Sequence, residues 1–215
     1  MYGLYGCCII NKISVNKSCA MGNWGSNVSP VLSAEAVDEY IELSYLNKNE
    51  IIRIYELLDN LESGCLKQNL HHRFPVEQID KVLPQIRCNP FRDAIYRVFS
   101  SKQDGCLSFE DTLDLCSAFS ANCPRGVRAT WAFEIFDFDG DNEISLNDLI
   151  EIVRRLTSTD ERGQDRIDPQ HAQNIARMIL REMDLSGTGS IELQEFIHMI
   201  AKMPDFAHTF QFKIL

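Results

Sequence analysis

Residues 137–148 read Asp-Phe-Asp-Gly-Asp-Asn-Glu-Ile-Ser-Leu-Asn-Asp, and residues 184–195 read Asp-Leu-Ser-Gly-Thr-Gly-Ser-Ile-Glu-Leu-Gln-Glu. Both twelve-residue stretches place oxygen-bearing side chains at positions 1, 3, 5, 9 and 12, with a turn residue at position 6. The backbone carbonyl of position 7 adds a further oxygen to such a loop. The pattern therefore predicts two loops that wrap a hard divalent cation.

The first loop offers four carboxylates. Its predicted ligands, in order of position, are Asp137, Asp139, Asp141, the Glu143 carbonyl, Ser145 and Asp148. Carboxylates about 4 Å apart repel one another by several kcal/mol at intermediate dielectric, so the cluster needs a cation. Position 6 holds Asn142, which tolerates the left-handed backbone that the turn requires. Position 12 holds Asp148 in place of a longer glutamate, which favours six ligands and Mg²⁺ over seven ligands and Ca²⁺.

The second loop carries fewer charges. Its predicted ligands are Asp184, Ser186, Thr188, the Ser190 carbonyl, Glu192 and Glu195, with Gly189 at the turn. Glu195 is long enough to bind a cation with both oxygens, which favours Ca²⁺. We expect this loop to be the calcium-responsive site.

Apolar residues recur at helical spacing on both sides of each loop. A helix, a twelve-residue cation loop and a second helix form an EF-hand. Ile144 and Ile191 both fall at position 8, where paired hands join through a short β bridge. The chain therefore ends in a pair of EF-hands, which we number hands 3 and 4.

Two weaker repeats precede this pair. Residues 100–111 align with the same twelve positions, but Ser100 and Lys102 stand at positions 1 and 3. We expect the Lys102 ammonium to occupy the place of the cation in this hand, which we call hand 2. A helix pair near 50–59 and 76–83 encloses a ligand-poor segment and predicts a degenerate hand 1.

Helix boundaries follow from capping residues. Asn89 is expected to cap a helix that begins at Pro90, and Ser108 to start the next helix. Asp168-Pro169, after the polar linker 157–166, predicts an N-cap followed by proline at the first helical position.

The predicted fold is all-α: four EF-hands in two pairs, with short two-residue β bridges between paired loops. The expected domains are an N-terminal leader over 1–29, an N-terminal pair without metal over 30–122, a metal-binding C-terminal pair over 123–203, and a C-terminal tail over 204–215.

Composition narrows the function. The chain has 215 residues, 45% of them hydrophobic, and a formal net charge of −10, which suits one or two domains and argues against a nucleic-acid partner. Eight cysteines without C-x-x-C spacing fit thiols in a reducing cytosol better than a zinc site. No apolar run approaches the ~18 residues of a membrane span. Since no nucleophile or H-E-x-x-H motif stands out, we do not expect an enzyme.

Several motifs together resemble the calcium- and integrin-binding protein family, which is related to calcineurin B and the recoverin group. The motifs are Asn89-Pro90-Phe91-Arg92, Arg97-Val98-Phe99-Ser100, Leu107-Ser108-Phe109-Glu110-Asp111, Phe136-Asp137-Phe138-Asp139 with Asp148, and Pro204-Asp205-Phe206. The resemblance runs from about residue 30 to the C-terminus. Ser186 and Thr188 depart from the aspartates common in the family's fourth loop.

The resemblance implies that only hands 3 and 4 bind metal, with Mg²⁺ or Ca²⁺ in hand 3. It also implies a sensor or adaptor that binds an amphipathic helix from the cytoplasmic segment of a membrane protein, such as an integrin α tail or a mechanotransduction channel subunit. A regulatory subunit of an enzyme, like calcineurin B, and a plain Ca²⁺ or Mg²⁺ buffer remain alternatives. The tail, with Phe206, Phe210 and Phe212, either packs as core or acts as a flap over the target groove.

Residues Met21-Gly22-Asn23-Trp24-Gly25-Ser26 fit the N-myristoylation pattern, provided that Met21 is an alternative start. Gly22 would then carry the lipid. Because one myristoyl chain binds a membrane only marginally, a second signal such as a membrane-protein partner is needed. We expect a cytoplasmic protein, peripheral at the plasma membrane.

Overall fold

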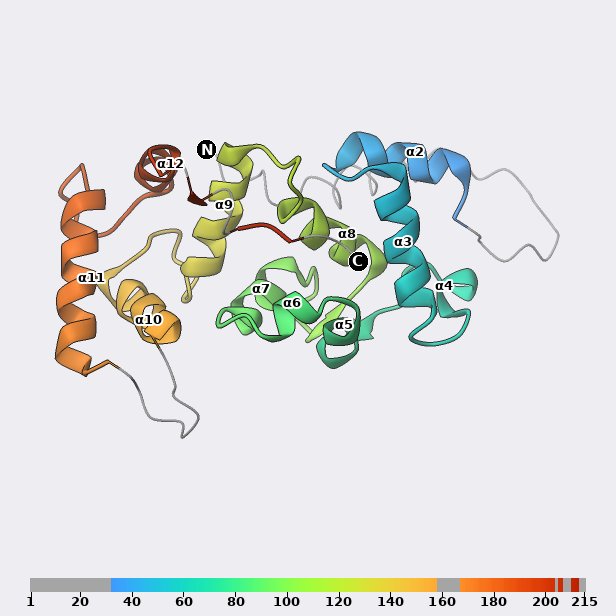
Figure 1. Ribbon diagram of the computed structural model, residues 1–215, viewed down its shortest axis with the longest axis horizontal. Helices are drawn as coiled ribbons and strands as arrows, with labels where there is room; N and C mark the ends of the chain where they lie inside the picture. The colour runs from blue at the N-terminus through green and yellow to red at the C-terminus, as the bar shows by residue number, and fades with distance from the viewer. Residues whose placement is uncertain (1–31, 158–166, 204, 207–209, 213–215) are drawn as a thin grey trace. The chain divides into compact units, whose positions relative to one another are not determined.

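The structure is a computed structural model that describes residues 32–157, 167–203, 205, 206 and 210–212. These residues form helices, one two-stranded sheet and a single β bridge, which confirms the predicted all-α EF-hand fold (Figure 1). The predicted leader over 1–29, including Gly22, lies outside the described residues, as does most of the linker 157–166.

The chain divides into two compact units that are not contiguous in sequence. The N-terminal unit contains the described residues up to Arg87, then Phe99–Cys123, and the segment from Gln211 onward. The C-terminal unit contains Cys88–Val98 and Pro124–Phe210. Residues 88–98, which sequence order places in the 30–122 pair, are thus grouped with the C-terminal hands.

The N-terminal unit is built from six helices and two strands among its described residues. They are α2 (Ala34–Leu43), α3 (Lys48–Asp59), α4 (Cys65–Gln68), β1 (Phe74–Pro75), α5 (Val76–Val82), α6 (Pro84–Arg87), β2 (Cys106–Leu107) and α8 (Phe109–Ala118). Phe109 is fully buried, and the rings of Tyr40 and Tyr55 meet it edge-on at 5.6 and 5.7 Å. Helices α2, α3 and α8 therefore share one aromatic core.

Strands β1 and β2 join hands 1 and 2. They pair antiparallel, with Phe74 opposite Leu107 and Pro75 opposite Cys106. Leu107 stands at position 8 of the hand 2 loop, so this sheet is the predicted two-residue bridge. Phe74 and Leu107 are both fully buried, which anchors the two loops to the core.

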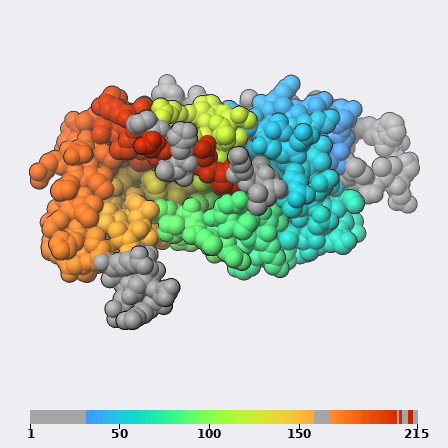
Figure 2. Space-filling view, in the orientation of Figure 1, coloured from blue at the N-terminus to red at the C-terminus, as the bar shows by residue number. Residues whose placement is uncertain are grey.

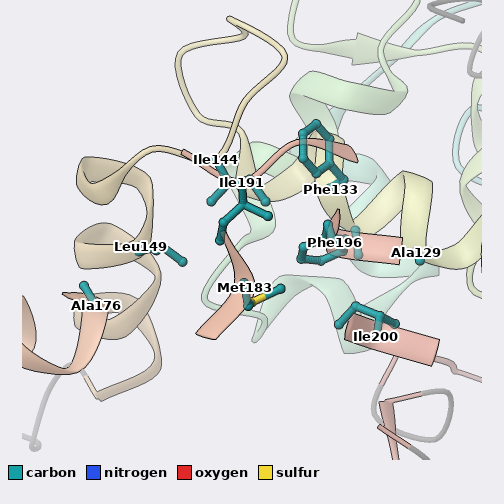
Figure 3. Packing of buried hydrophobic residues seen from close by; sticks show 10 residues of the cluster. Ala129, Phe133, Ile144, Leu149, Ala176, Met183, Ile191, Phe196 and Ile200 are labelled. Carbon is teal, nitrogen blue, oxygen red and sulfur yellow. The ribbon is translucent and has the colours of Figure 1, made fainter. Parts of the chain in front are cut away.

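The C-terminal unit contains most of α7 (Arg92–Phe99), together with α9 (Arg125–Phe136), α10 (Leu146–Thr157), α11 (Pro169–Met183) and α12 (Leu193–Ala201). Helix α9 packs against α12, and α10 against α11. Their apolar faces meet in one buried cluster, in which Phe133 lies edge-on to Phe196 and Ile144 lies beside Ile191 (Figure 3). This cluster, the C-terminal core, includes Ile144 and Ile191 from the two predicted cation loops.

Two of the three predicted helix starts are confirmed at the predicted residues. Ser108 caps α8 in a capping box with Asp111, and Asp168 caps α11 with Pro169 at the first helical position. The third differs, since α7 begins at Arg92 and not at Pro90. The Asn89 side chain still accepts a hydrogen bond from the Phe91 N–H at 2.8 Å, so it organises a turn that precedes the helix.

The described tail residues are divided between the two units. Phe206 and Phe210 are half-buried against the C-terminal core, and their rings stack at 5.6 Å. Phe212 belongs to the N-terminal unit, where its ring stacks on Phe119 at 5.1 Å. Helices α10 and α11 appear side by side in light and deep orange in Figure 2. Each carries an exposed apolar residue, Leu156 on α10 and Met178 on α11.

Candidate metal centre

The hand 3 loop brings its first three aspartates together. Carboxylate oxygens of Asp137, Asp139 and Asp141 all lie within 4.8 Å of one another. Asp137 is buried at the end of α9, which ends at Phe136, while Asp139 and Asp141 are exposed. Three convergent hard oxygen donors fit a hard divalent cation.

The turn of hand 3 depends on Asn142. Its φ is 68°, in the left-handed region, as the sequence predicts. That conformation lets the Asn142 N–H donate to Asp137 Oδ2 at 2.9 Å, while the Gly140 N–H donates to Asp137 Oδ1 at 2.7 Å. The backbone therefore fixes the orientation of the first ligand.

Asp148 closes the same loop from the first turn of α10. Its Oδ1 accepts from the Phe138 N–H at 3.2 Å, and its Oδ2 accepts from the Ser145 N–H and hydroxyl at 2.9 and 2.6 Å. The carboxylate is buried and ties the start of the loop to its end. Positions 9 and 12 are thus in direct contact.

The hand 4 loop joins its predicted oxygens in a chain. Ser186 Oγ lies 3.4 Å from Asp184 Oδ1 and 3.3 Å from Thr188 Oγ1, and the Thr188 hydroxyl donates to the Ser190 carbonyl at 3.2 Å. Positions 1, 3, 5 and 7 therefore face one another. Two hydroxyls here replace the aspartates found at positions 3 and 5 of hand 3.

Glu195 closes hand 4 as Asp148 closes hand 3. Its Oε1 accepts from the Leu185 and Ser186 N–H groups, each at 2.8 Å, and its Oε2 accepts from the Glu192 N–H at 2.9 Å. Glu192 completes a capping box with Glu195 at the start of α12. The structure thus clusters the first three aspartates of hand 3, joins Ser145 to Asp148, and links the oxygens at positions 1, 3, 5 and 7 of hand 4.

The two position-1 aspartates differ electrostatically. Burial, together with repulsion from Asp141, raises the pKa of Asp137 despite its backbone hydrogen bonds. Backbone N–H groups, led by that of Gly189, lower the pKa of Asp184. The pKa of Asp137 is raised mainly because burial penalises its charged form, and a cation bound nearby would favour that charged form again.

A single β bridge couples the loops. Ile144 and Ile191 exchange both backbone hydrogen bonds, at 2.9 and 3.0 Å, and both are fully buried. Beside the bridge, the Ser190 hydroxyl donates to the Glu143 carboxylate. The position-7 side chain of one hand therefore contacts the loop of the other.

Sequence reasoning missed Arg97 of α7. Its guanidinium donates to the carbonyls of Asp137, Glu134 and Phe138 at 2.7, 3.1 and 3.2 Å. A cation at this place satisfies the last carbonyls of α9 and opposes the negative end of the helix dipole. The available signal was its place in the Arg97-Val98-Phe99-Ser100 motif.

Arg155 makes a second tie between α7 and hand 3. Its guanidinium pairs with the Asp93 carboxylate of α7 and lies 4.5 Å from the centroid of the Phe138 ring. Phe138 is position 2 of the predicted cation loop of hand 3, so α7 contacts that loop through Arg155. This explains why residues 88–98 group with the C-terminal unit.

In hand 2 the expectation for Lys102 is wrong. Lys102 is exposed, and the guanidinium of Arg73, just before β1, lies against the loop oxygens at Ser100, Asp104 and Asp111. Arg73 reaches these oxygens because the neighbouring Phe74 pairs with Leu107 of the hand 2 loop. The cationic group therefore comes from hand 1 and not from within the hand 2 loop.

Two twelve-residue loops of oxygen donors, each between two helices and joined by a β bridge, define an EF-hand protein. The family model for an EF-hand domain pair matches residues 127–201. Similar curated proteins, named calcium and integrin-binding family member 2, come from Drosophila melanogaster, Homo sapiens and Ovis aries. The first is 33% identical over 186 residues, which is 84% of this chain and 95% of that protein. The second is 32% identical over 192 residues (87% and 99%), and the third 33% over 179 residues (81% and 98%). The chain belongs to the calcium and integrin-binding family.

Among the described residues, no helix is both long and apolar enough to cross a membrane.

Proposed function

We propose that the protein is a calcium- and magnesium-binding adaptor that holds an amphipathic helix from the cytoplasmic segment of a membrane protein. The observation that carries the proposal is the pairing of two complete oxygen-donor loops, through Ile144 and Ile191, over one apolar core. The names of the relatives, which mention calcium and integrin, support the same class of ligand and partner. The protein acts by binding and not by catalysis.

The cation ligands are the side-chain and carbonyl oxygens of the two loops. Hand 3 would use Asp137, Asp139, Asp141, the Glu143 carbonyl, Ser145 and Asp148, and hand 4 would use Asp184, Ser186, Thr188, the Ser190 carbonyl, Glu192 and Glu195. A bound divalent cation supplies the positive charge that offsets these carboxylates. The short Asp148 side chain favours Mg²⁺ in hand 3, and the longer Glu195 favours Ca²⁺ in hand 4.

The partner surface is the apolar side of the C-terminal core. Phe206 and Phe210 pack there half-buried, with their rings stacked on each other. Their spacing of four residues is that of two apolar anchors one turn apart on a helix. An amphipathic helix presents apolar anchors at the same spacing and would take their place. Cation binding and helix binding then strengthen each other by the same factor.

Deletion of 206–215 separates the two accounts of the tail. If the tail is a flap, the shortened protein binds a target peptide more tightly than the full chain does. If the tail is only core, the shortened protein loses stability and gains no affinity. Calorimetry of peptide binding and thermal unfolding on the same samples give both readouts.

The place of action is the cytoplasmic face of the plasma membrane. Gly22 would carry a myristoyl chain in a form that starts at Met21, and the membrane-protein partner would supply the second anchor. Mass spectrometry of the N-terminus from cells tests this part. A chain that always starts at Met1 and is unmodified would remove the lipid from the proposal.

The decisive experiment is calorimetric titration of an integrin α-tail peptide, which is amphipathic and membrane-proximal, into the full chain in excess Ca²⁺, in excess Mg²⁺ and in chelator. Binding restricted to the cation-loaded protein supports the adaptor. Equal binding in chelator favours a constitutive regulatory subunit of the calcineurin B kind. No binding in any condition, with no apolar-dye binding in Ca²⁺, favours a plain buffer.

A further inference from the structure

The hand 2 loop has the shape of a cation-binding loop, although position 1 holds the Ser100 hydroxyl in place of a carboxylate and position 3 holds Lys102, which offers no oxygen. Gly105 at position 6 has a φ of 71°, in the left-handed region. At the other end, Asp111 Oδ2 accepts from the Ser108 N–H at 3.0 Å, just as the position-12 carboxylates of hands 3 and 4 accept from position 9. Something other than a full ligand set therefore holds this loop in shape.

The group at its centre is the guanidinium of Arg73. Nε and Nη2 donate to the two oxygens of Asp104, position 5, at 2.9 and 2.8 Å. Nη2 also donates to the Ser100 hydroxyl, position 1, at 3.2 Å, and to the Cys106 carbonyl, position 7, at 2.6 Å. Nη1 donates to Asp111 Oδ2, position 12, at 2.9 Å.

These acceptors are the positions that hold a cation in an intact hand: 1, 5, 7 and 12. Nη1 also donates to the Ser101 hydroxyl, at 3.0 Å. A guanidinium is a permanent, planar cation with five donors, so one arginine can satisfy several oxygens around a single point. The match in position and in charge separates Arg73 from an ordinary surface ion pair.

Charge and burial agree with this placement. The side chain of Arg73 is 14% exposed and that of Asp111 is 1% exposed. Hydrogen bonding from Arg73 lowers the pKa of Asp104 to about 2. The second oxygen of Asp111, Oδ1, is buried and makes no hydrogen bond among the described residues. This carboxylate oxygen is therefore left for a further ligand such as a metal ion.

We infer that Arg73 is the resident cation of hand 2, supplied by hand 1 across the β1–β2 bridge, and that it covers a latent divalent-cation site. The latent ligands are the Ser100 hydroxyl, the Asp104 and Asp111 carboxylates and the Cys106 carbonyl. With Arg73 in place, the N-terminal pair keeps its loaded loop shape at any Ca²⁺ concentration. Without Arg73, the same loop depends on Ca²⁺ or Mg²⁺.

The test compares full-length wild type with Arg73→Met in chelator, in Ca²⁺ and in Mg²⁺. Thermal unfolding gives stability, and the amide resonance of Gly105 reports hand 2 separately from hands 3 and 4. We expect Arg73→Met to lower the unfolding midpoint in chelator by roughly 5–10 °C, because two carboxylates lose their shared partner. Added Ca²⁺ should restore part of that loss and shift Gly105, whose wild-type resonance should not respond.

Two further variants make the test decisive. Lys67→Met removes the 3.4 Å ion pair with Asp59 in the same unit and should show no shift of Gly105 with Ca²⁺. Arg73→Met with Lys102→Asp adds an oxygen ligand at position 3 and should bind Ca²⁺ more tightly than Arg73→Met alone. If Gly105 responds to neither Ca²⁺ nor Mg²⁺ in both Arg73 variants, or if both stay unfolded with either cation, the inference is wrong.

Discussion

The length of one side chain at position 12 separates hand 3 from hand 4. Asp148 and Glu195 make equivalent hydrogen bonds across their loops, so what distinguishes them is length: the shorter Asp148 side chain reaches a cation less easily with both oxygens. We predict that Asp148→Glu raises the ratio of Ca²⁺ to Mg²⁺ affinity at hand 3 by about tenfold, or ~1.4 kcal/mol. The reciprocal Glu195→Asp should lower that ratio at hand 4. Calorimetric titration of both cations measures each ratio, and unchanged ratios in both variants would contradict the role given to position 12.

A second residue-scale prediction concerns Asp114, on α8. Burial, with the negative charges of Asp111 and Glu110, raises its pKa from 3.8 to about 8. The unfolded chain therefore loses this proton near pH 4, whereas the folded protein keeps it until about pH 8. This one group thus causes stability to fall as the pH rises through that window.

The asparagine of Asp114→Asn cannot ionise. The variant should therefore match wild type in stability at pH 4 and become progressively more stable than wild type as the pH rises to 8. Thermal unfolding at the two pH values checks this, with the exposed Asp38→Asn as control. A difference of the same size at both pH values would show that Asp114 ionises normally in the folded protein.

At the scale of elements, α7 supports the hand 3 loop although its residues precede it by some forty positions. Arg97 makes three charge-assisted hydrogen bonds to the end of α9 and the start of the loop. We predict that Arg97→Met lowers the free energy of unfolding of the C-terminal unit by about 2–3 kcal/mol, since the freed carbonyls lose a charged donor. It should also weaken cation binding at hand 3.

The matched control for Arg97 is Arg154→Met on α10. The Arg154 side chain is 51% exposed and pairs with Glu151 at 3.8 Å, so its removal should cost about 0–1 kcal/mol. Urea unfolding in Ca²⁺ compares the two variants. An equal loss in both would mean that α7 lies beside the loop without stabilising it.

At this scale, the sequence could predict features that depend on residues close together in the chain. The loops, their flanking helices, the caps at Ser108 and Asp168 and the left-handed turn at Asn142 all follow from patterns a few residues long. Arg73 and its partners lie 27–38 residues apart, and only the pairing of Phe74 with Leu107 brings them together. Lys102 is inside the loop, which predicts it as the internal cation, but its side chain is exposed to solvent.

At the scale of the whole molecule, the cation content of the two units differs in kind. Under the two proposals, the C-terminal unit takes Ca²⁺ or Mg²⁺ from solution, whereas hand 2 of the N-terminal unit uses the Arg73 guanidinium of its own chain. We predict that chelation speeds amide hydrogen exchange over 137–148 and 184–195 and leaves 100–111 unchanged, because Arg73 stays in place. Hydrogen exchange in Ca²⁺ and in chelator measures all three segments in one sample, and equal acceleration of 100–111 would contradict the prediction.

Phe212 adds a consequence for the synthesis of the protein. It belongs to the N-terminal unit, where its N–H donates to the Phe119 carbonyl at 3.2 Å and its ring stacks on that of Phe119. Segments made first usually fold first on the ribosome. Here the unit that begins the chain cannot be completed until residue 212 has emerged, after all four hands have been translated. Until then the ring of Phe119 has Phe99, at 6.4 Å, as an aromatic neighbour in this unit but lacks the stacked ring of Phe212.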